Sequence, residues 1–183
     1  MPREVSIPVG VIVARVKIDH KWADWSWRPI AVIPGAPPID EWREIESGEG
    51  WTHYHCGTVP LTLCRSDTEA YRVALSETPP RVYVVLRRDG EGDEDRPYFV
   101  ETVTASPYEA QDFLHSAEDL VEAVPMPPGI VAWVRAFVDE HHVDEKFVKR
   151  HRDRADPETP KFGKEPIFSK RRQGGHDAGG GEV

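Results

Sequence analysis

The residues best suited to metal chemistry gather in one short segment that contains His53, His55 and Cys56. In an extended strand, two residues at this spacing point to the same face, roughly 6–7 Å apart. Two imidazoles with a nearby thiolate suit zinc or another borderline metal. Cys56 alternates to the other face, so a complete site needs Cys64, His141 or His142 as well. The alternative is that both histidines are polar strand positions, because no paired metal-ligand spacing supports the site.

Five of the six tryptophans lie in the N-terminal third, at Trp22, Trp25, Trp27, Trp42 and Trp51. Such rings can stack on a planar ligand or anchor a protein partner. Arg28 beside Trp27 could add a cation–π contact. In a strand, Trp25 and Trp27 would share a face. We therefore expect these six residues to form a partner-binding region; the alternative is that the rings pack in the core and leave one exposed.

Signatures of catalysis are missing from the sequence. It contains no nucleophile-elbow, dinucleotide-binding or P-loop pattern. Cys56 follows His55 directly, so in a strand the thiol and the imidazole face apart. The acidic segment 89–95 lacks the spacing of a calcium loop and is typical of a solvated hairpin tip. These observations favour a protein without enzymatic activity.

Charge and composition narrow the class of partner. The chain of 183 residues has a net charge of −9, yet residues 143–172 hold ten Lys or Arg against six Asp or Glu. An acidic body argues against nucleic-acid binding as the main role, although the basic extension could contact RNA, an acidic partner or the body itself. No apolar run approaches the roughly 20 residues of a membrane span. Two cysteines form no disulfide framework, so we expect a reducing, cytoplasmic location.

The elements that would position these residues are strands followed by helices. Alternation and β-forming residues predict strands over residues 5–18, 29–33, 51–63, 81–88 and 97–104, the last two forming a hairpin. Residues 5–18 form either one long strand or two strands joined at 8–10. Ser66 and Glu69 resemble a capping box that opens a short helix over 66–76. The alternative is a strand, because Tyr71, Val73 and Leu75 alternate. Ser106 and Pro107 predict a helix to about Leu114. A second helical piece should begin at 116 and end before 125, and the main helix should follow 127–128 and reach 143, with a continuation through 149 as the alternative.

This order predicts an α+β fold: a mostly antiparallel sheet or small open barrel of about five or six strands, covered by C-terminal helices. Residues 1–152 should form one domain. Beyond it, apolar periodicity is lost and glycine accumulates, so residues 153–183 should be a disordered tail, first basic and then Gly-rich.

Several segments together resemble a bacterial domain family of unknown function. They are residues 27–34, 54–58, 68–71, 81–87, 103–112, 124–127, 137–143 and 147–150, so the resemblance covers about 5–150. Genes of that family typically lie near those for molybdenum- or tungsten-dependent formate dehydrogenase and its maturation factors. The family brings no known catalytic residues to this chain. The resemblance implies a role in assembling or regulating that enzyme, with one of its subunits or a maturation factor as the protein partner.

Two functions follow as hypotheses. The first is a non-enzymatic accessory protein that binds a polypeptide through the aromatic region and needs no cofactor. The alternative is a small protein or enzyme that handles zinc or a molybdopterin-type cofactor through the region of His53, His55 and Cys56.

Overall fold

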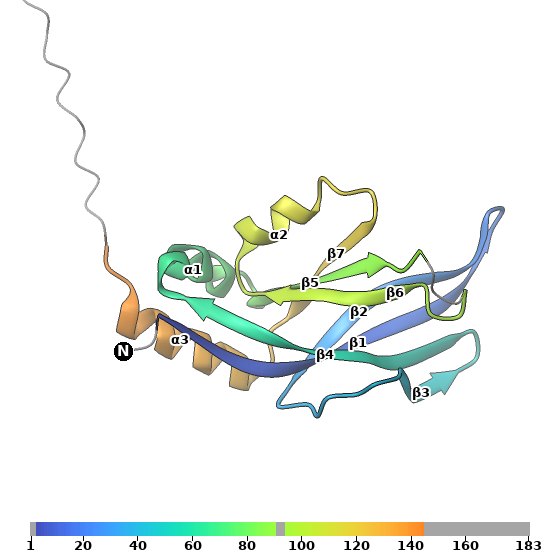
Figure 1. The fold of residues 1–183 in the computed structure, drawn as a ribbon, viewed down its shortest axis with the longest axis horizontal. Helices are drawn as coiled ribbons and strands as arrows, with labels where there is room; N and C mark the ends of the chain where they lie inside the picture. Colours follow the sequence, from blue (N-terminus) through green and yellow to red (C-terminus); the bar gives the residue numbers. More distant parts are fainter. Residues whose placement is uncertain (1–2, 91–93, 145–183) are drawn as a thin grey trace, which may run out of the picture. The chain divides into compact units, whose positions relative to one another are not determined.

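The structure is a computed structural model that describes residues 3–90 and 94–144 (Figure 1). Residues up to Asp144 group into one compact unit. The expected domain boundary at 152 and the expected disordered tail lie outside the described residues.

Seven strands and three α-helices make up this unit. The strands are β1 (Glu4–His20), β2 (Ala23–Pro34), β3 (Arg43–Gly48), β4 (Trp51–Cys64), β5 (Arg81–Arg88), β6 (Tyr98–Thr104) and β7 (Asp119–Pro125). The helices are α1 (Thr68–Ser76), α2 (Pro107–Phe113) and α3 (Pro128–His141), with a 3-10 turn at Arg65–Asp67 before α1.

The strands form a single, mostly antiparallel sheet that curls on itself. Its order is β2-β1-β4-β6-β5-β7, and β3 pairs with the first part of β4. β4 and β6 are the parallel pair, joined at Leu61 and Val103. β2 and β7, at the two ends of this order, lie in contact, so the sheet is a nearly closed barrel. The predicted α+β class with a mostly antiparallel small barrel is confirmed.

All three helices lie toward one end of the barrel, and the turns of the long hairpins lie toward the other (Figure 1). α3 places Ile130, Val134, Phe137 and Val138 on one stripe that is buried in the core, as its helical period requires. Tyr71 of α1 meets Phe137 edge to face, with ring centroids 6.3 Å apart. We call the opposite end, with the β1–β2 and β3–β4 turns and residues 94–97, the hairpin end.

Alternation along β1 defines an inner and an outer face of the sheet. Val9, Val11 and Val13 are fully buried and belong to the core cluster. The next position in this series, Arg15, continues the inner face toward the hairpin end. A bulge opposite Val11 and Ile12 leaves Cys56 of β4 unpaired between its neighbours. The core therefore fills the helical end, and polar and aromatic side chains occupy the hairpin end.

Several predicted elements are confirmed in place. The strands β1, β4, β5 and β6 appear as expected, and β5 pairs with β6 as an antiparallel hairpin. α2 begins after Ser106, whose Oγ accepts a hydrogen bond from the Glu109 amide at 3.2 Å. The short helix predicted over 66–76 is present as α1, which ends at Ser76 as predicted.

Other predictions were wrong. The expected helical piece after 116 is instead the strand β7, because β5 has a free edge that residues 119–125 satisfy along their whole length. β3 was not predicted, and helices α1 and α2 precede the last strand, so the helices are not all C-terminal. Ser66 does not cap α1: it lies inside the 3-10 turn, and Asp67 takes the N-cap position without a side-chain hydrogen bond. α3 ends at His141, two residues before the expected end.

Candidate binding surface

The tryptophan-rich segment folds as the first half of β2, a longer strand than predicted. Trp27 pairs with Arg15 of β1, and Trp25 pairs with Lys17. Directly opposed residues share a face, so Trp25 and Trp27 both lie on the inner face at the hairpin end. The expected common face of these two rings is confirmed.

Four rings gather there in what we call the ring cluster: Trp25, Trp27, Trp42 and Tyr54. Trp27, Trp42 and Tyr54 contact one another, whereas Trp25 is joined to them through Arg15. Trp27 meets Trp42 edge to face at 5.6 Å between ring centroids. Tyr54 lies 5.6 Å from Trp42 and 6.3 Å from Trp27. Trp27 and Trp42 also pack against the hydrophobic core. These offset and edge contacts are the arrangements that aromatic rings favour, so the cluster has a defined geometry.

A guanidinium lies among these rings. The Cζ of Arg15 is 4.4 Å from the ring centroid of Trp25, 5.7 Å from that of Trp27 and 5.5 Å from that of Tyr54. The Arg15 side chain is 18% exposed, and its terminal nitrogen lies 3.7 Å from a carboxylate oxygen of Asp95. Its Nε is buried and has no hydrogen-bond partner. Cation–π attraction therefore holds a partly desolvated positive charge at this end of the barrel.

The other residues of the predicted binding region lie elsewhere. Trp22 is 81% exposed in the β1–β2 turn, where the Nζ of Lys21 approaches its ring at 5.1 Å. Trp51 is opposite Val16, which puts it on the outer face. Arg28 pairs with Ala14 and so also faces outward, away from Trp27. The sheet thus divides the predicted region into the inner ring cluster, an exposed tip and an outer face.

His53 and His55 do share one face of β4, the outer one. The His53 ring packs on Trp51 at 4.7 Å and lies 4.0 Å from the Glu46 carboxylate. Nε2 of His55 is 3.0 Å from the hydroxyl of Thr58, which itself donates to the Pro37 carbonyl at 2.7 Å. Since that hydroxyl proton is already used, Nε2 of His55 is the donor to Thr58.

The two cysteines are separated from this pair. Cys56 is buried, its thiol donates to the Val11 carbonyl at 3.4 Å, and burial raises its pKa to about 12. Cys64, at the far end of β4, lines a hollow together with Tyr71 and Glu109. Burial, followed by the charges of nearby acidic residues, raises the pKa of the Cys64 thiol as well. Neither cysteine is therefore primed to ionise at neutral pH.

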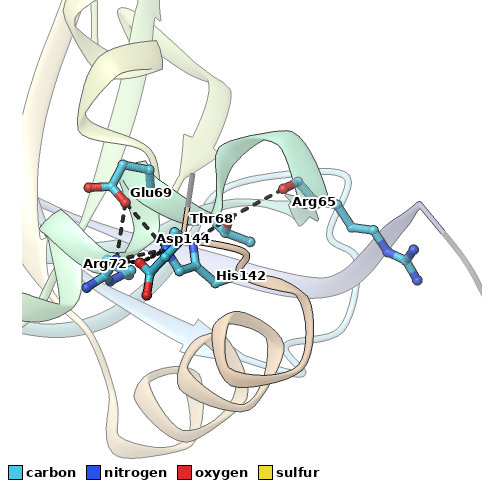
Figure 2. A network of polar contacts seen from close by, with 6 residues as sticks. All are labelled: Arg65, Thr68, Glu69, Arg72, His142 and Asp144. Atoms are coloured by element: carbon cyan, nitrogen blue, oxygen red, sulfur yellow. Dashed lines mark hydrogen bonds and ion pairs between the residues drawn. The ribbon is translucent and has the colours of Figure 1, made fainter. Parts of the chain in front are cut away.

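His142 belongs to a polar network that joins the end of α3 to α1 (Figure 2). Its Nδ1 lies 3.0 Å from the Thr68 hydroxyl, and its Nε2 lies 2.7 Å from Arg72 and 3.1 Å from Asp144. Arg72 also contacts Glu69 at 3.4 Å. The hydrogen bond to His142, and then the charge of Arg72, hold the pKa of Asp144 below its usual range. Both nitrogens of His142 therefore have protein partners.

The structure consequently does not bring His53, His55, Cys56, Cys64 and His142 together. Within residues 3–90 and 94–144, no three His, Cys, Asp or Glu side chains are grouped so as to hold a metal ion. In the same part of the chain, no helix is long and apolar enough to cross a membrane.

Sequence reasoning missed Tyr54, which belongs to the ring cluster, and Arg15, which lies among its rings. A signal for Arg15 was present, because it continues the alternating series of Val9, Val11 and Val13 and so is a cation at a core-facing position. Nothing in the sequence indicated that Trp42, which lies outside the strands, would reach Tyr54.

Fold and surface together define a small α+β barrel domain with an aromatic cluster around Arg15 at its hairpin end. The chain belongs to the family described as protein of unknown function (DUF3305), which matches residues 8–151. Searches of curated proteins and of solved structures found no significant match.

Proposed function

We propose that this protein is a non-enzymatic accessory protein that binds a partner polypeptide through its hairpin end. The observation that carries the proposal is the exposure of Trp22 at the tip of the β1–β2 hairpin, close in sequence to a ring cluster of fixed geometry. Tryptophan is the residue most enriched among interface hot spots, where it contributes large contact area at low entropic cost.

The organisation of the barrel supports this role for the hairpin end. The three helices lie at the other end (Figure 1). At the hairpin end, Trp22 is exposed and the four rings of the ring cluster are half-buried. Trp27 and Trp42 pack on the core and hold the surface rigid, while Trp22 projects outward. A rigid aromatic base with a projecting anchor limits the ordering cost of binding.

The proposed partner is a subunit or maturation factor of a molybdenum- or tungsten-dependent formate dehydrogenase. This part of the proposal is supported by the resemblance to a family encoded beside those genes, and the protein would act in assembly or regulation of the enzyme. A reducing, cytoplasmic compartment belongs to the same proposal, because Cys56 and Cys64 are both free thiols.

The test is native co-purification of the tagged full chain from its own cell, quantified by mass spectrometry. Formate dehydrogenase subunits or their maturation factors should accompany the wild type and be depleted about tenfold or more with Trp22→Ala. Tyr108→Ala is the matched control, since Tyr108 is an aromatic residue of α2 with 54% exposure at the opposite end. The proposal fails if none of these proteins is recovered, or if both variants retain them equally.

One observation favours the metal-handling alternative: His53 and His55 share the outer face of β4. Metal content of the purified full chain tests it, with His53→Ala and His55→Ala as variants. Stoichiometric metal that is lost in both variants would establish this alternative, and its absence from the wild type would remove it.

A further inference from the structure

Arg15 is a cation whose hydrogen-bonding capacity is not met. Its guanidinium has five N–H donors in a planar fork, and buried donors are normally paired. Here Nε is buried without a partner, and the carboxylate of Asp95, at 3.7 Å, is beyond hydrogen-bond distance. The faces of Trp25, Trp27 and Tyr54 attract the charge, but they do not pair with the buried Nε of Arg15.

From this geometry we propose that Arg15 is a recognition site for a carboxylate in an acidic peptide segment of the protein partner. The carboxylate replaces Asp95 at the guanidinium, and an apolar side chain next to it packs on the ring cluster. This inference rests on the proposed function and names the chemistry of the partner segment.

Arginine is suited to this task because its fork binds both oxygens of a carboxylate. Trp25 and Tyr54 already hold the fork in place, so little side-chain freedom is lost on binding. The Asp95 side chain is 77% exposed and its ion pair with Arg15 is long, so this pair contributes little and opposes replacement by another carboxylate only weakly. Lys17, opposite Trp25, adds a second positive charge on the same face.

The same surface does not suit a polyanion. The whole chain has a net charge of −9, and Glu44 lies opposite Tyr54 on the inner face. These charges oppose a string of phosphates, while one carboxylate held directly at Arg15 is stabilised over a short distance. The observations therefore favour a peptide over a nucleic acid.

The experiment is an NMR titration of the full chain that follows the tryptophan indole N–H signals. The probe is the peptide acetyl-Phe-Asp-Phe-Glu-amide, and its matched control is the neutral acetyl-Phe-Asn-Phe-Gln-amide. We expect saturable shifts of the Trp25 and Trp27 signals with the acidic peptide, and binding about tenfold weaker with the neutral one, the effect of losing a charge-assisted hydrogen bond.

Two variants sharpen the result. Arg15→Met keeps the apolar stem and should abolish the difference between the two peptides. Asp95→Asn removes the competing carboxylate and should tighten binding of the acidic peptide about three- to fivefold, since a weak ion pair no longer competes. If Arg15→Met does not fold, the affinity of Asp95→Asn for the acidic peptide, compared with that of the wild type, tests the site by itself.

The inference is overturned by equal binding of both peptides, by weaker binding with Asp95→Asn, or by no saturable shift up to about 10 mM, the range of an interaction too weak to be specific. Shifts caused by a single-stranded oligothymidine and not by the acidic peptide overturn it too.

Co-purification with the same variants separates this inference from the proposed function. If Trp22→Ala loses the partner and Arg15→Met keeps it, the accessory role stands and the carboxylate site falls. If Trp22→Ala keeps the partner, the proposed function itself falls.

Discussion

Trp27→Ala should lower the stability of the fold, whereas Trp22→Ala should weaken partner binding and leave the stability unchanged. Trp27 packs against the core and makes ring contacts with Trp42 and Tyr54. Trp22, five residues earlier, is 81% exposed. The two positions belong to the same hairpin, so they form a matched pair of substitutions that differ mainly in burial.

The expected cost follows from the area that each ring removes from water. A tryptophan buries about 150–250 Å² when enclosed, and roughly 100–150 Å² of this is lost at a partly buried site such as Trp27. At about 25 cal/mol per Å² this corresponds to about 3 kcal/mol, and lost edge-to-face contacts add up to about 1 kcal/mol. For a domain of this size, a total of about 3–4 kcal/mol should lower Tm by about 6–16 °C. Trp22→Ala should change stability by less than about 0.5 kcal/mol.

Urea unfolding followed by far-UV circular dichroism measures both variants without relying on tryptophan fluorescence. We expect the midpoint to fall for Trp27→Ala and to stay unchanged for Trp22→Ala. Equal destabilisation by the two substitutions, or a neutral Trp27→Ala, would refute the assignment of one ring to the scaffold and the other to the exposed anchor.

Three further predictions concern the scaffold. Gly10→Ala should destabilise the fold by about 1–3 kcal/mol in urea unfolding, because an added Cβ would lie 2.7 Å from the Cβ of Ala36 and 2.8 Å from Nε2 of His55. Arg87 donates to Asp119 at 2.8 Å and holds the pKa of that carboxyl below its usual 3.8. The pair therefore stabilises the fold above about pH 4, and this contribution is lost as the pH falls further. Arg87→Met should flatten this acid dependence of Tm. The Cys56 thiol, with its pKa raised to about 12, should react with an aromatic disulfide reagent at pH 8 far more slowly in the folded protein than in urea, as located by peptide mapping.

Each of these has a result that would contradict it. An unchanged urea midpoint for Gly10→Ala would show that the His55 ring is not held against the strand. An Arg87→Met variant with the same acid transition as the wild type would assign the acid dependence to other carboxyls. Labelling of Cys56 at equal rates with and without urea would show that its thiol is not enclosed.

The local sequence was enough to predict those elements that are set by short-range chemistry. β5 reads as a run of β-forming residues, and its bounds match the predicted strand 81–88. Ser106 and Pro107 predict the start of α2, and the structure has Ser106 as its N-cap and a proline in its first turn. These signals are contained within a few neighbouring residues, so no knowledge of the rest of the chain is needed to use them.

β7 and β3 were not predictable in the same way, because each forms by backbone hydrogen bonding to an adjacent strand. Residues 119–125 pair with β5 at every position from Arg81 to Arg87. β3 is exposed throughout and depends on the first part of β4. Local preference is weak in such segments, and the backbone hydrogen bonds offered by the adjacent strand decide the outcome.

The sequence by itself determined which residue types are available at the hairpin end: several tryptophans, carried by strands whose side chains alternate between two faces. Only the tertiary structure decided which rings meet. Pairing between β1 and β2 turned Trp25 and Trp27 inward to Arg15, while the same register sent Arg28 outward. Alternation assigns residues to faces, but which face becomes the inside, and which distant residue lies opposite, depends on long-range pairing and closure of the sheet.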